Sequence, residues 1–204
     1  MHRLEPVIHP VAVDALKPTQ ITVGYREVAE KRRVWRERVD KDGPEFLGQH
    51  MVPALKGPKG RLYVIDHHHL ARALLEEGVA KVAVSIIADL SALSRSEFWA
   101  HCDNRGWCHP YNAEGERRDF SDIPSQISKL VDDPFRSLAG ELRRAGGYAK
   151  EVTPFTEFMW ADFLRRRVKT KLVQDDFAAA LTKALKLAKS DAAQHLPGWC
   201  GPTT

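Results

Sequence analysis

The sequence has few cysteines and no long apolar segment. Its three cysteines form an odd set without the regular spacing of a disulfide framework, which favours a reducing compartment over secretion: Cys102, Cys108 and Cys200. No run approaches the roughly 20 consecutive apolar residues that a membrane-spanning helix needs, and the N-terminus lacks the pattern of a signal peptide. We therefore expect a cytoplasmic protein with no membrane partner.

Internal repeats and low-complexity segments are also lacking, so we expect neither a repeat architecture nor a long disordered tract. The chain has 204 residues, of which 43% are hydrophobic and 28% are charged, as is typical of a folded protein. The 31 lysines and arginines outnumber the 27 aspartates and glutamates, for a net charge of +4. This mild positive charge permits nucleotide or nucleic acid partners without requiring them.

Residues 1–90 have the pattern of a small mixed α/β core. A helix is expected over residues 25–40, where arginine and lysine side chains predict either a solvated face or a nucleic-acid-binding face. A hairpin is expected over residues 51–65, because glycine and proline separate two apolar runs. The β-branched residues of 81–88 are typical of a central strand.

Residues 91–204 are predicted to form a helical extension packed on this core. Ser94 and Glu97 have the spacing of a capping box, which predicts the first helix. Three further helices are expected from their start signals, at Asp133-Pro134, Thr153-Pro154 and Asp175. The predicted fold class is therefore α+β, with a mixed sheet core followed by helices.

A cluster of histidines lies where the hairpin should lead into a helix. Residues 63–65 suit a strand and Asp66 suits a helix N-cap, so His67, His68 and His69 should occupy the opening helical turn. Free N–H groups and the positive end of the helix dipole favour an anion there, and a phosphate is the obvious candidate. The alternative is that one or two of these histidines are buried and hydrogen-bonded, or solvated.

The same turn resembles the ParB/sulfiredoxin superfamily. In that superfamily a helix opens directly off a hairpin strand, with Gly-Glu-Arg-Arg or Gly-x-His-Arg at the turn, and binds a nucleotide phosphate or a related anion. Here residues 66–72 read Asp-His-His-His-Leu-Ala-Arg, and the upstream residues 16–20 fit the superfamily's Leu-x-Pro loop. The resemblance implies a core of the same fold and an anion at this turn.

The resemblance is closer to one family of that superfamily, described as putative ParB-like nucleases. Its members carry Pro-Thr-Gln-x-x-Val-Gly, here residues 18–24, together with Asp-His-His-His. Their helical tail contains Asp-Asn-Arg-Gly-Trp, here residues 103–107, and Gly-Gly-Tyr-x-Lys, here residues 146–150. The resemblance covers roughly residues 10–170.

Three features of better-known members of the superfamily are missing. The strand-to-helix turn does not carry Gly-Glu-Arg-Arg, and no helix-turn-helix pair follows the core, so centromere-type DNA binding and the CTP switch of partition proteins are not expected. The reactive cysteine of sulfiredoxins is replaced by Asp66 and the histidines, so reduction of a sulfinic acid is not expected either.

Phosphoryl transfer or phosphodiester cleavage needs cationic donors on the phosphate oxygens and a base for the attacking group. The predicted donors are the side chains of the turn: His67, His68, His69 and Arg72. His68 and His69 are also predicted to be catalytic, and Arg72 suits a bidentate contact.

Glu27 is the predicted base, because superfamily kinases of free serine use a glutamate near the loop after the first strand; Glu30 is an alternative. Glu27 could instead be an exposed helix carboxylate paired with Lys31 one turn on.

Further residues could bind a nucleotide. Lys31 and Lys150 could reach a phosphate, or be exposed lysines without a specific partner. Thr19 and Gln20 could hold a ribose or a base edge, or stabilise their own turn. Tyr148 could cover a bound base or belong to the core.

A metal is a competing explanation for the histidines. Adjacent residues on a helix point about 100° apart, so three consecutive histidines cannot easily face one ion. His101, Cys102, Cys108 and His109 are a second candidate, but their spacing departs from that of structural zinc sites. Mg²⁺ bound with a nucleotide such as ATP or CTP, with Asp66 as a ligand, is the better expectation.

The leading hypothesis is a ParB-like enzyme that cleaves a phosphoester or phosphoanhydride bond, as a nuclease or a nucleotide hydrolase. One alternative is a nucleotide-dependent kinase of a small hydroxy amino acid. The other is a non-catalytic DNA- or nucleotide-binding protein that uses the basic helix. In each case the expected partner is the phosphate of a nucleotide or nucleic acid.

Overall fold

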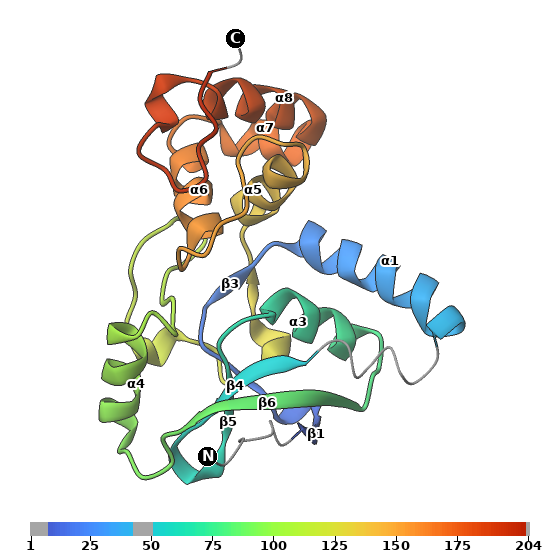
Figure 1. Cartoon of the computed structure of the whole chain (residues 1–204), viewed down its shortest axis with the longest axis vertical. Coiled ribbons are helices and arrows are strands. Elements are labelled where there is room, and N and C mark those ends of the chain that lie inside the picture. The colour runs from blue at the N-terminus through green and yellow to red at the C-terminus, as the bar shows by residue number, and fades with distance from the viewer. Residues whose placement is uncertain (1–7, 43–50, 203–204) are drawn as a thin grey trace, which may run out of the picture. The chain divides into compact units, whose positions relative to one another are not determined.

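The computed structural model describes residues 8–42 and 51–202, and the chain forms two compact units (Figure 1). The first unit comprises Met1–Thr22, Val28–Asn112 and Arg117–Val131, and the second comprises Val23–Glu27, Ala113–Glu116 and Asp132–Thr204. Residues 1–7 and 43–50 of the predicted core lie outside the described residues. Residues 91–112 and 117–131 belong to the first unit, although the sequence placed them in the helical extension.

A five-stranded mixed sheet forms the centre of the first unit. Its order is β1 (Ile8–Ala12), β6 (Lys81–Asp89), β4 (Val52–Lys56), β5 (Leu62–Val64) and β2 (Lys17–Pro18). β1 runs antiparallel to β6, and β4 runs antiparallel to β5. β6 is parallel to β4, and β2 is parallel to β5. The helices and this mixed sheet confirm the predicted α+β class.

The predicted hairpin is confirmed by the pairing of β4 with β5, in which Ala54 lies opposite Val64. A short 3₁₀ turn (Pro58–Gly60) joins the strands, and the N–H of Gly57 donates to the carbonyl of Arg61 (2.8 Å). Lys59 in this turn has a left-handed backbone with φ of 61°. Glycine and proline thus produce the reversal that the sequence predicted.

Helices α3 (His68–Glu76) and α4 (Arg95–Asn104) belong to the first unit. α3 buries one face, formed by Leu70, Ala71, Ala73 and Leu74. The capping box of Ser94 and Glu97 at the start of α4 is confirmed. Helix α1 (Tyr25–Asp42) begins in the second unit and continues into the first from Val28 onward.

The second unit is helical. It contains α5 (Pro134–Arg144), α6 (Thr156–Arg165), α7 (Thr170–Asp175) and α8 (Phe177–Ala188). Their buried sides meet around Trp160, which is fully buried and stacks on Tyr148 at 4.4 Å between ring centroids. Tyr148 is therefore a core residue, as one of the two interpretations proposed.

Two of the predicted helix starts differ from those observed. Asp133 caps α5 as predicted, by accepting the N–H of Phe135. The cap of α8 is Asp176 and not Asp175, which ends the unpredicted helix α7. Both aspartates are suitable caps, and only the tertiary packing selects the second. α6 begins at Thr156, after Phe155 in a left-handed conformation.

Two short strands, β3 (Thr22–Val23) and β7 (Val131–Asp132), form a second sheet. The carbonyl of Ile21 accepts from the N–H of Val131 (3.0 Å). Within residues 8–42 and 51–202, no helix combines the length and apolarity needed to cross a bilayer.

Candidate functional site

The turn between β5 and α3 has an unusual backbone. His67 has φ of 65° and ψ of 26°, in the left-handed region that a side chain bearing a β-carbon disfavours by about 1–2 kcal/mol. Helix α3 begins at the next residue, His68. The predicted N-cap at Asp66 is wrong, because His67 occupies that position and makes no side-chain cap bond. Asp66 instead accepts the N–H of His67 (2.6 Å), so its carboxylate bonds to the turn itself.

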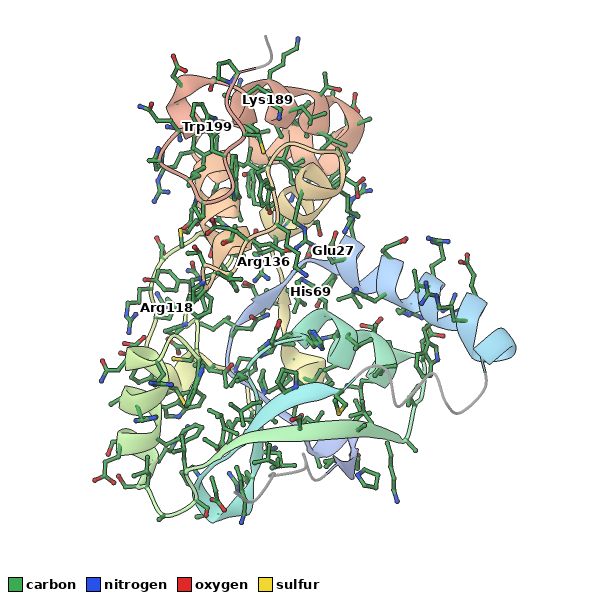
Figure 2. All side chains as sticks on the ribbon, in the orientation of Figure 1. Glu27, His69, Arg118, Arg136, Lys189 and Trp199 are labelled. Atoms are coloured by element: carbon green, nitrogen blue, oxygen red, sulfur yellow. The ribbon has the colours of Figure 1, made fainter. Side chains whose placement is uncertain are left out.

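The side chains at the outer part of this turn are exposed. The Asp66 side chain is 77% exposed and the His67 side chain is 47% exposed. Their carboxylate Oδ2 and imidazole Nε2 lie 3.9 Å apart. His69 is half-buried in the first turn of α3, where Figure 2 labels it. The turn thus presents two imidazoles to solvent, that of His67 more than that of His69.

His68 is a buried, hydrogen-bonded histidine. Its Nε2 accepts the backbone N–H of Thr19 (3.1 Å), and the hydroxyl of Thr19 donates to the carbonyl of Val64 (2.7 Å). The loop after β2 is in this way attached to the end of β5 and to the start of α3. For His68 the structural interpretation is therefore the observed one, and a catalytic role would have to act through this contact.

Gln20 lies in the same buried loop. Its amide Nε2 donates to the carbonyl of Thr22 (2.7 Å), and the N–H of His109 donates to the carbonyl of Thr19 (2.9 Å). Turn stabilisation by Thr19 and Gln20 is thus observed, while their contact with a ribose or base stays a prediction.

Arg72 joins α3 to η4 (Ile127–Lys129). Its Nη1 donates to the carbonyl of Ser128 (2.6 Å), and its Nε donates to Glu76 (2.6 Å). The side chain is only 14% exposed. These donors are used within the first unit, so phosphate binding by Arg72 stays a prediction that would require rearrangement of these bonds.

Glu27 belongs to the second unit, where its buried carboxylate pairs with the more exposed Arg144. Both of its oxygens accept from Arg144, with Nη2 to Oε1 at 2.5 Å and Nη1 to Oε2 at 2.7 Å. The Glu27 side chain is 10% exposed. The alternative of an exposed carboxylate paired with Lys31 is wrong, and the catalytic role of Glu27 stays a prediction.

A glycine provides the room for this ion pair. A β-carbon at Gly140, on α5, would lie 2.8 Å from Oε1 of Glu27. Arg144 also contacts Glu141 (2.6 Å). Sequence reasoning missed Arg144 and Gly140, because they lie more than 100 residues from Glu27 and no local pattern connects them.

The basic face of α1 is largely neutralised within the first unit. Arg32 and Arg36 both contact Glu77, at the C-terminus of α3 (2.5 and 2.7 Å). Arg33 pairs with Glu30 and Glu37 on its own helix. Lys31 and Lys150 are exposed, as expected of solvated lysines, and their phosphate contacts stay predictions.

Comparison with known proteins now adds to this geometry. A family model described as "Putative ParB-like nuclease" matches residues 9–166. The chain belongs to this ParB-like family. The crystal structure of protein Atu1540 from Agrobacterium tumefaciens is similar, at 54% identity and a TM-score of 0.91, over 98% of this chain and 100% of that one. No curated protein matches the chain.

The ParB-like family motif at residues 103–107 lies at the end of α4. Asp103 pairs with Arg117 (2.7 Å), whose guanidinium lies 5.9 Å from the ring centroid of Tyr111. These contacts hold the loop after α4 in the first unit. The motif thus has an observed structural use.

The candidate metal ligands of this ParB-like chain do not form a cluster among the described residues. Among the described residues, no group of three or more histidine, cysteine, aspartate or glutamate side chains is arranged to hold a metal ion. Burial raises the pKa of the Cys102 and Cys108 thiols to about 12, which keeps both protonated at neutral pH. Binding of Mg²⁺ by the exposed Asp66 together with phosphate oxygens stays a prediction.

Proposed function

We propose that the β5–α3 turn binds a phosphate group and that the chain is a phosphoester- or phosphoanhydride-cleaving enzyme of the ParB-like family. The observation that carries this proposal is the left-handed backbone of His67, whose imidazole is exposed. Strained residues of this kind persist where the surrounding structure holds them in place, and they cluster at binding and catalytic sites.

In this proposal the turn supplies two kinds of donor. The imidazoles of His67 and His69 contact phosphate oxygens, and the N–H groups of the first turn of α3 add neutral donors. His68 is a positioning residue, because it holds the loop at Thr19 against the turn. Mg²⁺ with ATP or CTP would use Asp66 as a ligand, and the metal would neutralise the phosphate charge.

Glu27 is the proposed base. Its two oxygens bond to Arg144, so activation of water or a hydroxyl would require this ion pair to open or to share an oxygen. Should Glu27 not act in this way, the family membership and the turn favour the alternative of a non-catalytic nucleotide- or DNA-binding protein. Nucleic acid as the partner and a cytoplasmic location remain parts of this proposal.

The direct test is turnover by the purified full chain. Supercoiled plasmid, ATP, CTP and bis-p-nitrophenyl phosphate would each be supplied with Mg²⁺, and free serine would be added to the ATP reaction in a separate arm. We expect hydrolysis that falls by at least about 100-fold in H69A and E27Q, consistent with loss of an acid–base or charge-stabilising group. H101A removes an exposed histidine of α4 and is the matched control.

The outcomes separate the candidate functions. Turnover that requires serine would identify the kinase. Binding without turnover, unaffected by E27Q and steeply weakened by salt, would identify the non-catalytic alternative. Turnover by H67A/H69A equal to that of H101A would refute a role for the turn.

A further inference from the structure

Arg136, in the second unit, is a buried cation with unsatisfied donors. The residue is 4% exposed, and neither its Nε nor its Nη1 has a hydrogen-bond partner. Burial of an unpaired guanidinium costs several kcal/mol, so such a group calls for a physical explanation. Desolvation lowers the pKa of Arg136 below its ordinary value, which reflects the same cost.

The carboxylates around Arg136 do not supply the missing bonds. Three of them are close enough to act on its charge, and Figure 2 shows one of these, Glu27, in the same part of the second unit. Each is paired with a different arginine: Glu157 with Arg143 (2.9 Å), Asp133 with Arg165 (2.5 Å) and Glu27 with Arg144 (2.5 Å). The phenol of Tyr148 donates to the carbonyl of Ala139. Arg136 thus lies in a cluster in which each of the three neighbouring carboxylates is paired with another arginine.

One face of the guanidinium is covered by an aromatic ring. The Cζ of Arg136 lies 3.4 Å from the ring centroid of Phe158, a close cation–π contact. This contact fixes the plane of the guanidinium but leaves the N–H groups of Nε and Nη1, which lie in that plane, without acceptors. Phe158 is only partly buried, and residues 151–154 before it are exposed.

We propose that Arg136 binds a phosphate group, either inorganic phosphate or the phosphate of a nucleotide, in the second unit. A phosphate supplies a negative charge opposite the guanidinium of Arg136. It also supplies several oxygens that can accept hydrogen bonds from the in-plane donors. This site is separate from the β5–α3 turn and does not depend on the function proposed for it. The carboxylates around Arg136 would repel an anion, so a bound anion must contact the guanidinium directly.

The test compares two arginines on one helix. R136M removes the unpaired charge with little change in volume, and R143M removes a paired arginine seven residues further along α5. Thermal unfolding of the full chain would be followed against sodium phosphate, and separately against ATP, at constant ionic strength. Every protein in this test carries H67G, which should remove phosphate binding at the β5–α3 turn. In this background the parent and R143M should gain about 5–10 °C in melting temperature when the ligand is 100 times its dissociation constant, and R136M should gain nothing.

A response to phosphate but not to ATP would restrict the ligand to the free anion, and the reverse would restrict it to the nucleotide. Either supports the site, provided that R136M abolishes it. The proposal is overturned if H67G responds to neither ligand, or if H67G/R136M responds as H67G/R143M does. Should R136M not fold, the Nε–H resonance of Arg136 in the wild-type protein must shift during the same titration, and its failure to shift overturns the proposal. The H67G background keeps this test independent of phosphate binding at the β5–α3 turn.

Discussion

His67 holds a left-handed backbone that glycine would adopt without strain. We predict that H67G raises the free energy of unfolding by up to about 1 kcal/mol, because strain is removed while the imidazole contributes few contacts. The same substitution should abolish phosphate binding at the turn, where the imidazole is a proposed donor. Denaturant unfolding and a phosphate titration measure the two effects.

Lys59 provides the matched control, since it is exposed and has nearly the same φ, 61°. K59G should stabilise the chain by a similar amount and leave binding unchanged. A stabilised H67G that binds as K59G does would mean that the strain serves no binding function.

His68 and His69 are adjacent but should respond differently. H68A leaves the N–H of Thr19 without its buried acceptor, which should lower the free energy of unfolding by about 1–3 kcal/mol. H69A, at a half-buried position, should cost less while lowering activity more. Equal losses of stability in the two variants would contradict the positioning role of His68.

The sequence predicted elements whose signals are local. The hairpin of β4 and β5, the capping box of α4 and the cap of α5 at Asp133 each depend on residues within a few positions of one another. The helix start after β5 was misplaced, because no local sequence signal marks the positive φ at His67. The pairing of Glu27 with Arg144 could not be predicted for the same reason.

Helix α5 contains a glycine that the ion pair requires. Gly140→Ala would normally stabilise a helix interior by about 1 kcal/mol. Here its β-carbon would displace the Glu27 carboxylate, and loss of bonds between charged groups should outweigh that gain by about 1–2 kcal/mol. The prediction is a net loss of stability on unfolding in urea.

A second background tests the cause. In E27A the carboxylate is gone, so G140A should become stabilising. If G140A changes the free energy of unfolding by the same amount with and without Glu27, close packing between residue 140 and Glu27 is not the cause of the loss.

The contact between α1 and the C-terminus of α3 should depend on pH. Hydrogen bonds from Arg36 and then Arg32 lower the pKa of Glu77 from 4.5 to about 2. A carboxyl whose pKa is lowered in the folded state stabilises the fold above its unfolded pKa, and this stabilisation is lost as pH falls through the folded value. The difference in unfolding free energy between wild type and E77Q should therefore be constant near pH 7 and disappear between pH 4.5 and about 2.

The unfolding free energy of the double variant R32Q/R36Q should depend on pH as weakly as that of E77Q, since the two arginines that lower the pKa of Glu77 are removed. A difference between wild type and E77Q that persists at pH 2 would mean that Glu77 acts by packing and not by charge.

At the scale of the whole molecule, the family and the α+β class were predictable because short motifs and hydrophobic patterns carry them. The match over residues 9–166 confirms the family, and the similarity to protein Atu1540 extends over 98% of the chain. The division into two units was not predictable, because residues 23–27 and 113–116 join the second unit only through tertiary contacts. Arg136, with its unsatisfied donors, illustrates the same limit, since burial is a property of the folded chain.

The most direct test of the account is a nuclear magnetic resonance titration of the full chain with Mg²⁺ and, in turn, inorganic phosphate, ATP and CTP. The account predicts that at least one ligand shifts the backbone amide signals of residues 67–70 in a saturable manner, and that H67G removes these shifts while K59G keeps them. Signals of residues 67–70 that stay unchanged at saturating concentrations of all three ligands would contradict it.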